Sequence, residues 1–270
     1  MSASITIIHE PTASEPFVVL SKPAGLASAP LNESESQNAL AECARLFPSV
    51  KNVKGKKAVE GGLLHRIDTA TSGLLLVATS QEFYDHIIAA QEKGLFVKGY
   101  RAECDVNADN GQTLGAFPPL AAQTVAAASL SCKQFVAQNP AALCGLELSS
   151  YFRPFGKGSK EVRPVLPTSN VAALKKIGSK KIYSTKIARA ELFDGNTATL
   201  ECKIAQGYRH QVRCHLAWLG FPVRGDRLYN SSCREDSAAD QAGAGDMRFE
   251  AFSLEFPDLC SDKTFRFALD

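Results

Sequence analysis

The chain has 270 residues, of which 45% are hydrophobic and 21% are charged, and its formal net charge is +2. A chain of this length buries a sizeable core without disulfides or structural metals, and this composition excludes the disordered, collagenous and coiled-coil classes. No apolar run approaches the roughly 18 residues that a transmembrane helix requires. Residues 1–10 lack the basic start and the apolar stretch of a secretory signal, so we expect a cytoplasmic protein that does not bind membranes.

Short apolar or alternating runs predict β-strands along most of the chain. In chain order they span residues 5–8, 17–20, 74–78, 95–106, 181–193, 197–205 and 248–256. Helical spacing predicts helices over residues 37–47, 81–93 and 211–219. Gly94 and Gly220 follow the last two, as glycine commonly does at a helix C-terminus. Short strands interspersed with helices indicate an α+β fold with one main antiparallel or mixed sheet.

Residues 107–148 differ from the rest of the chain because they are rich in Ala and Leu and nearly uncharged. Within them, residues 120–138 have the pattern of one helix. No internal repeat is visible in the sequence. We therefore expect a single domain over residues 1–270, with a possible helical insertion at 107–148.

Positive charge is concentrated in one part of this nearly neutral chain. Residues 151–189 contain ten Lys or Arg and a single acid, and a smaller basic cluster lies at residues 51–57. Such concentration is typical of a surface that binds a polyanion. A solvated surface helix or loop is the alternative.

Two polar clusters stand within apolar sequence. The first, His65-Arg66-Ile67-Asp68, leads toward the predicted strand at 74–78. A carboxylate there needs compensation by an arginine or by backbone donors. The alternative is a loop in which Arg66 and Asp68 satisfy each other.

The second cluster spans Gly207–Leu216. If it opens a helix, Arg209 and Arg213 lie four residues apart on one face, where two guanidinium groups suit a carboxylate or phosphate partner. His210 and His215 have a poor spacing for metal ligands, and none of the eight cysteines forms a CxxC pair. We therefore expect no metal site, and we expect reduced, buried thiols.

Four sequence motifs follow one another along the chain. Lys22–Gly25 resembles KPxG, His65–Leu74 resembles HRLDxxTSGL, and Lys98–Ala102 resembles KxYxA. Gly207–Leu216, with the following Gly220–Tyr229, resembles GRTHQIRVHL…GxPIxGDxxY. Together they resemble the motifs of the RluA-type RNA pseudouridine synthases, which modify ribosomal or transfer RNA.

The resemblance implies a role for individual residues. Asp68 matches the catalytic aspartate, and Tyr100 matches the tyrosine that stacks on the target base. Arg213 matches the arginine that forms an ion pair with the aspartate. Arg66 matches an arginine that takes the space of the flipped-out nucleotide. The family's fold is a mixed, mostly antiparallel sheet flanked by helices and loops, and it needs no cofactor or metal.

The sequence therefore predicts an isomerase that converts uridine to pseudouridine in structured RNA. The partner is ribosomal or transfer RNA, and a monomer is the expected oligomeric state. We expect further contacts to RNA from residues of the motifs and from lysines of the basic segment. These are His65, Arg209, Lys175, Lys176, Lys180 and Lys181.

Two other functions remain open at this point. One is a non-catalytic RNA-binding or RNA-chaperone protein on the same scaffold, which the intact Asp68, Tyr100 and Arg213 disfavour. The other is a hydrolase that uses Asp68 with His65, which no separate nucleophile or oxyanion motif supports.

Overall fold

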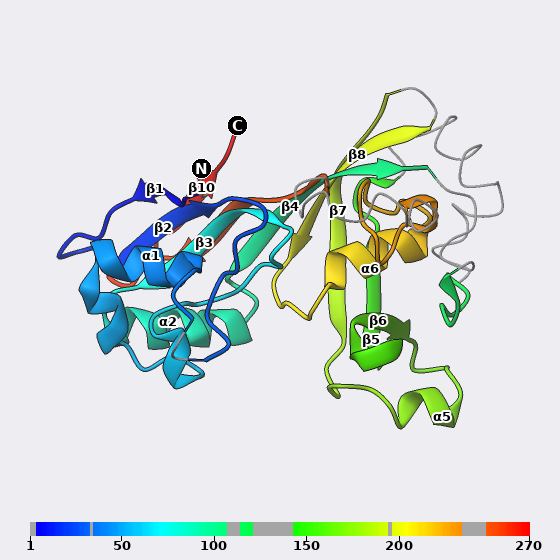
Figure 1. Ribbon diagram of the computed structural model, residues 1–270, viewed down its shortest axis with the longest axis horizontal. Coiled ribbons are helices and arrows are strands. Elements are labelled where there is room, and N and C mark those ends of the chain that lie inside the picture. Colours follow the sequence, from blue (N-terminus) through cyan, green and yellow to red (C-terminus); the bar gives the residue numbers. More distant parts are fainter. Residues whose placement is uncertain (1–3, 33–34, 107–113, 121–142, 194–195, 234–246) are drawn as a thin grey trace. The chain divides into compact units, whose positions relative to one another are not determined.

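The computed structural model describes residues 4–32, 35–106, 114–120, 143–193, 196–233 and 247–270. The chain packs into two compact units, each of which is described by itself (Figure 1). Unit 1 contains the described parts of Met1–Gly99 and Glu250–Asp270. Unit 2 contains those of Tyr100–Ala242 and Asp246–Phe249. The assignment of residues 1–270 to a single domain stays a prediction.

Unit 1 is built around a sheet with the strand order β1-β2-β3-β9, and β10 pairs with β9. The strands are β1 (Thr6–His9), β2 (Phe17–Lys22), β3 (Ser72–Ala78), β9 (Phe249–Pro257) and β10 (Thr264–Ala268). Strand β2 is antiparallel to both β1 and β3, whereas β3 and β9 are parallel. At the parallel pair, a Cβ on Gly73 would lie 2.3 Å from the Ala251 carbonyl oxygen, so only glycine permits this approach.

Two capped helices belong to unit 1. In α1 (Ala39–Leu46), the Asn38 side chain accepts a hydrogen bond from the Ala41 N–H. In α2 (Gln81–Glu92), the Ser80 side chain caps the first turn in the same way. Two short 3₁₀ helices, η1 (Pro48–Asn52) and η2 (Ala58–Glu60), follow α1.

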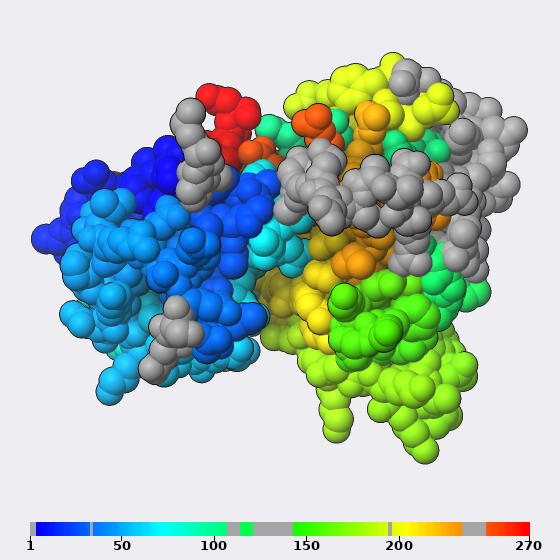
Figure 2. Space-filling view, viewed as in Figure 1, coloured from blue at the N-terminus to red at the C-terminus, as the bar shows by residue number. Residues whose placement is uncertain are grey.

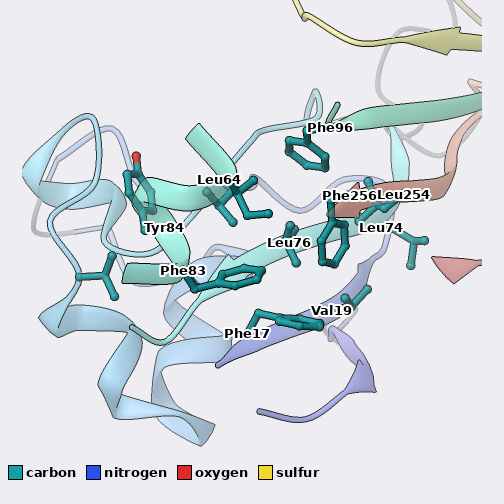
Figure 3. Close-up of a cluster of buried hydrophobic side chains, with 13 residues drawn as sticks. Phe17, Val19, Leu64, Leu74, Leu76, Phe83, Tyr84, Phe96, Leu254 and Phe256 are labelled. Carbon is teal, nitrogen blue, oxygen red and sulfur yellow. The ribbon is translucent and has the colours of Figure 1, made fainter. Parts of the chain in front are cut away.

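An aromatic core holds unit 1 together (Figure 3). Phe17 of β2 stacks on Phe83 of α2 with 4.8 Å between ring centroids, and the Phe256 ring of β9 meets Phe17 edge-on. Offset and edge-on contacts of this kind add about 0.5–1.5 kcal/mol each to the burial of the rings. Tyr84 lies at the margin of the cluster with its hydroxyl directed away from it (Figure 3).

Unit 2 has the strand order β4-β8-β7-β5-β6. The strands are β4 (Val97–Asp105, which begins in unit 1), β5 (Glu147–Phe155), β6 (Glu161–Val165), β7 (Tyr183–Leu192) and β8 (Thr197–Ile204). The pairs β5–β6, β5–β7 and β7–β8 are antiparallel. Its helices are α5 (Val171–Leu174), α6 (Gln211–Leu219) and the 3₁₀ turns η5 (Lys157–Ser159) and η6 (Ser231–Cys233).

Helix α6 is buried along its whole length. Cys214, Ala217 and Trp218 pack in one apolar cluster with Phe152 of β5 and Tyr229. The helix ends at Gly220, whose φ of 94° lies in the left-handed region that glycine adopts without strain. Because the helix is fully buried, its polar side chains also lie in the core, and their positions there form part of the site.

The expected α+β class and the mostly antiparallel sheet are confirmed. The pairing of β9 with β3 is parallel, which makes the sheet mixed. Strands β5, β6 and β10 were not predicted from the sequence. The predicted helix at 120–138 lies almost wholly outside the described residues, as does most of the possible insertion at 107–148. Among the helices of the described ranges, none is long and apolar enough to cross a membrane.

Candidate functional site

Asp68 lies in unit 1 on the loop that precedes β3, and its side chain is half-buried. The loop is fixed by Ser28, whose hydroxyl donates to the Ile67 carbonyl at 2.7 Å and accepts from the Ile67 N–H at 3.2 Å. The Thr71 N–H closes a turn onto the Asp68 carbonyl at 3.0 Å. The buried Ser28 hydroxyl thus binds both the N–H and the carbonyl of Ile67, the residue before Asp68.

Lys22, at the end of β2, is fully buried beside this loop. Its ammonium donates to the carbonyls of Pro23 at 2.9 Å, Leu26 at 2.7 Å and Thr69 at 3.2 Å. Burial lowers the pKa of Lys22 to about 8, against the opposing attraction of the Asp68 carboxylate. Lys22 therefore ties two loops together and places positive charge near Asp68. The sequence marked it as part of a motif, but the role follows only from the structure.

His65 is packed into unit 1. Its Nε2 accepts a hydrogen bond from the Leu76 N–H at 3.2 Å, its Nδ1 is buried, and its ring meets Phe96 edge-on at 5.3 Å. Burial lowers the pKa of His65 to about 3, and the charge of Lys98 acts in the same direction. This geometry gives His65 a packing role, so it supports neither the predicted contact with RNA nor the hydrolase that uses this ring as a base.

Arg66 is the exposed member of the same motif. Its Nη1 lies 3.1 Å from Oε1 of Glu60, a carboxylate that is almost wholly buried. Lys57 Nζ lies 3.9 Å from the same oxygen. Arg66 thus has a carboxylate partner in Glu60, and its pairing with Asp68 stays a prediction. Glu60 was not predicted from the sequence, where its position at the end of a lysine-rich loop was the available signal.

Tyr100 lies on β4 and is buried within unit 2. Its ring stacks on Phe249, with 5.3 Å between centroids and 11° between planes. A tyrosine fixed in this way presents a rigid aromatic surface at little cost in conformational entropy. Its predicted stacking on a base stays a prediction.

Arg213 lies on α6 and pairs with Asp226. Its Nε and Nη2 lie 2.7 and 2.8 Å from the two carboxylate oxygens, and both side chains are buried. Oδ1 of Asp226 also accepts from the N–H groups of Leu228 and Tyr229. This two-pronged geometry is the strongest form of an arginine–carboxylate contact. Asp226 was not predicted as the partner of Arg213, although its place in the Gly-Asp motif was a signal.

Arg209 does not lie on the helix. Helix α6 begins only at Gln211, and His210 before it has a left-handed φ of 56°. The prediction that Arg209 and Arg213 share a helix face is therefore wrong, because the chain turns between them. Arg209 is exposed, and its Nη2 donates to the carbonyls of Ser159 at 2.5 Å and Glu161 at 3.3 Å.

His215 lies on α6 and is fully buried. Its ring nitrogens lie 2.9 Å from the hydroxyls of Ser150 and Thr185, which can each donate or accept. Burial lowers the pKa of His215 to about 3. The ring is therefore neutral and structural at physiological pH.

The predicted lysines of the basic segment follow α5 in the chain, in a stretch whose yellow-green atoms lie at the surface of unit 2 (Figure 2). Lys175, Lys176, Lys180 and Lys181 are all exposed. Arg163, counted in the same segment, is fully buried, where it donates to the carbonyls of Leu114 and Gly115 and pairs with Glu161. The segment thus contains both surface cations and a structural arginine, which charge counting cannot separate.

The structure does not bring all predicted residues into one unit. His65, Arg66 and Asp68 belong to unit 1, whereas Tyr100 and Arg213 belong to unit 2. The ion pair of Arg213 with Asp68 stays a prediction. Within the part of the chain that is described, no group of three or more His, Cys, Asp or Glu side chains is placed to hold a metal ion.

Comparison with known proteins gives consistent matches. The RNA pseudouridylate synthase family model matches residues 16–218. Ribosomal large subunit pseudouridine synthase D of Haemophilus ducreyi is 22% identical over 241 residues, which are 88% of this chain and 56% of that protein. An uncharacterised protein of Caenorhabditis elegans is 24% identical over 220 residues, which are 79% of this chain and 38% of that protein.

A shorter match is to the mitochondrial tRNA pseudouridine(32) synthase of Saccharomyces cerevisiae, 31% identical over 75 residues, 28% of this chain and 16% of that protein. The chain thus matches less than two thirds of the length of each of these relatives. Among solved structures, human RNA Pseudouridylate Synthase Domain Containing 1 superposes with a TM-score of 0.57 at 18% identity, over 100% of this chain and 84% of that one. Human RNA Pseudouridylate Synthase Domain Containing 4 gives 0.55 at 16% identity, over 98% and 87%. These structures share the expected fold.

Proposed function

This chain belongs to the RNA pseudouridylate synthase family, as its motifs predicted, and on this premise we propose that it isomerises uridine to pseudouridine in RNA. The observation that carries the proposal is the family match over residues 16–218, which includes Lys22, Asp68, Tyr100 and Arg213. The reaction breaks the bond from N1 of the base to C1′ of the ribose and forms a bond from C5 to C1′. The proton leaves C5 and N1 gains one, so atoms balance without an oxidant, a reductant or a group donor.

We assign the chemistry to Asp68. Its carboxylate acts on the sugar or the base once the N1–C1′ bond weakens. Lys22 places a positive charge near this carboxylate through its ammonium, and Ser28 fixes the peptide before Asp68. No cofactor is needed for this step, because the reaction is an internal rearrangement.

Tyr100 and Arg213 have supporting roles in this proposal. Tyr100 provides a platform for the extruded base and is a candidate to accept the C5 proton. Unstacking a base costs a few kcal/mol, which aromatic stacking of about 1–3 kcal/mol partly offsets. Arg213, fixed by Asp226, has a guanidinium whose orientation is set before RNA arrives.

The substrate class is structured RNA. The names of the relatives include a ribosomal and a transfer RNA enzyme, so both RNA classes are candidates for this chain. A cytoplasmic location and a monomeric state are parts of the proposal, to be tested by cell fractionation and by light scattering.

Replacement of Asp68 by Asn or Ala tests the assignment. We expect both variants to bind RNA and to lose turnover, because the side chain is on a loop and is not part of the core. Release of tritium from RNA labelled at C5 of uridine measures turnover, and filter binding measures affinity. Near-normal release by Asp68→Ala would remove Asp68 from the chemistry. Binding without release by the unaltered protein, on transcribed ribosomal and transfer RNA alike, would favour the non-catalytic RNA-binding function.

The exposed lysines that follow α5 in the chain are proposed to contact RNA phosphates. Each lost phosphate contact lowers the slope of log K against log salt by about 0.7–0.9. We expect combined replacement of Lys175, Lys176, Lys180 and Lys181 by Ala to weaken RNA binding several-fold and to lower this slope. The single-turnover rate at saturating protein changes little, because Asp68 is untouched. An unchanged slope identifies these lysines as a solvated surface only.

A further inference from the structure

A second basic surface lies on unit 1, on the loop of residues 51–57, named here the basic loop. Its four lysines are Lys51, Lys54, Lys56 and Lys57, and all four are exposed. No acid occurs between residues 51 and 59. The corresponding light-blue atoms lie at the surface of unit 1 (Figure 2). Such a local excess of positive charge attracts a polyanion.

The backbone of the basic loop is anchored although its side chains are exposed. The Lys54 N–H donates to Gln81 Oε1 at 2.8 Å, and the Lys56 N–H donates to the Tyr84 hydroxyl at 2.9 Å, both on α2. Val53, between them, is buried in the aromatic core. A Cβ on Gly55 would lie 2.2 Å from the Gly61 carbonyl oxygen, so glycine is needed for the loop to close. The ammonium groups are therefore carried on a preformed backbone.

Glu60 joins this loop to the motif that carries Asp68. Its carboxylate lies 3.1 Å from Nη1 of Arg66 and 3.9 Å from Nζ of Lys57. The Glu60 side chain is 10% exposed, whereas that of Arg66 is 54% exposed. One end of the guanidinium is thus held by a buried carboxylate while the rest faces solvent, two residues from Asp68. A long arginine side chain held in this way loses less conformational entropy when it binds a ligand.

We propose that the basic loop and Arg66 form a preformed contact surface for the phosphates of the RNA strand next to the target nucleotide, with Glu60 as the positioning residue. The inference rests on the proposed function, because it takes Asp68 as the residue that meets the target. The surface and Asp68 lie on the same unit. RNA held there is therefore anchored to the unit that carries the carboxylate.

Removal of the lysines tests the surface. The variant Lys54→Ala/Lys56→Ala/Lys57→Ala loses three positive charges from the basic loop. The control is Arg45→Ala/Lys93→Ala/Lys263→Ala, which loses three exposed charges elsewhere on unit 1. The probe is unmodified transfer RNA made by transcription, and affinity is measured from low to moderate salt. We expect the salt slope of the first variant to fall by about 2 and that of the control to stay unchanged. Equal slopes in the two variants overturn the proposal.

The direction in which Glu60→Gln changes RNA affinity separates two explanations of the role of Glu60. If Glu60 were only a negative charge in a basic surface, its neutralisation would strengthen RNA binding. If it positions Arg66, neutralisation weakens binding several-fold, and the same change in an Arg66→Ala background has no further effect. Tighter binding by Glu60→Gln excludes the positioning role. Because a change at the buried Glu60 also affects the stability of the fold, Arg66→Ala is measured as a separate single variant. This exposed change lowers the salt slope by about 0.7–0.9, and an unchanged slope overturns the contact.

These measurements separate the inference from the proposed function. Absence of tritium release by the unaltered protein on every RNA tested contradicts the isomerase, whatever the salt slopes are. Normal release together with equal slopes in the lysine variants contradicts only the contact surface.

Discussion

Each unit buries a cation on an element that the family motifs identify, but the partners of the two cations differ. In unit 1 the Lys22 ammonium is met by three backbone carbonyls, which carry only partial charge, so its field still acts on Asp68. In unit 2 the Arg213 guanidinium is met by the carboxylate of Asp226, and this pair is neutral as a whole. The charge of a buried cation that is bound only by backbone dipoles still acts on neighbouring groups. A buried cation that is paired with a carboxylate is neutralised and mainly fixes the positions of the two side chains.

The two basic surfaces differ in a parallel way. The basic loop of unit 1 is fixed to α2 by two backbone hydrogen bonds and by the buried Val53. The α5 segment of unit 2 is short, and none of the side chains in α5 is buried. After α5, the Gly178 N–H donates to the Phe152 carbonyl at 2.8 Å. Unit 1 therefore presents its lysines on a backbone that is fixed to α2, whereas unit 2 presents its lysines beside a short helix with no buried side chain.

The largest expected effect tests the carboxylate-held cation of unit 2. Arg213→Met leaves Asp226 buried without its partner, and we expect a loss of about 3–5 kcal/mol in the free energy of unfolding. Urea denaturation followed by circular dichroism measures it. The double variant Arg213→Met/Asp226→Asn removes the buried charge and should recover much of the loss. A double variant as unstable as the single one would show that the pair is not the source of stability.

Both units also bury a neutral histidine, and acid should destabilise each of them. The pKa of His65 and of His215 is lowered to about 3, whereas an unfolded chain has the ordinary value near 6.5. Between these values the unfolded state binds more protons, so stability rises with pH and is lost as pH falls below 6.5. We expect each histidine to contribute roughly 1 kcal/mol per pH unit in this window. His215→Gln and His65→Gln should each flatten the dependence measured by urea denaturation at pH 7, 6 and 5. Constant stability over that range would contradict the assignment of neutral, buried rings.

The smallest effect on stability should come from Lys22. Its lowered pKa means that burial disfavours the charge, so Lys22→Met should change the free energy of unfolding by no more than about 1–2 kcal/mol. Turnover should nevertheless fall more than about ten-fold, because a shift of 1.4 kcal/mol in the barrier already has that effect. Denaturation and tritium release are measured on the same preparation. A loss in the free energy of unfolding as large as that of Arg213→Met, or unaltered turnover, would contradict the proposed difference between Lys22 and Arg213.

Local sequence determined the elements whose signals are self-contained. Helix α2 has a capping serine, an apolar face and a closing glycine within residues 80–94, and it forms within one residue of the expected bounds. Helix α6 was predicted at its observed limits from its apolar pattern and the closing Gly220, although no side chain caps its first turn. The motif around Asp68 was also legible, because its residue types and spacing are unusual within apolar sequence.

Tertiary structure alone decided the partners. The parallel pairing of β3 with β9 joins residues far apart in the chain, and nothing local to either strand specifies it. Arg163 and Lys175 look alike in a charge count, yet one is buried on backbone carbonyls and the other is exposed. The pairs Glu60–Arg66 and Arg213–Asp226 depend on which side chains burial brings together. Periodicity records which face of an element is apolar, but the charge that a buried group meets is set by packing between elements.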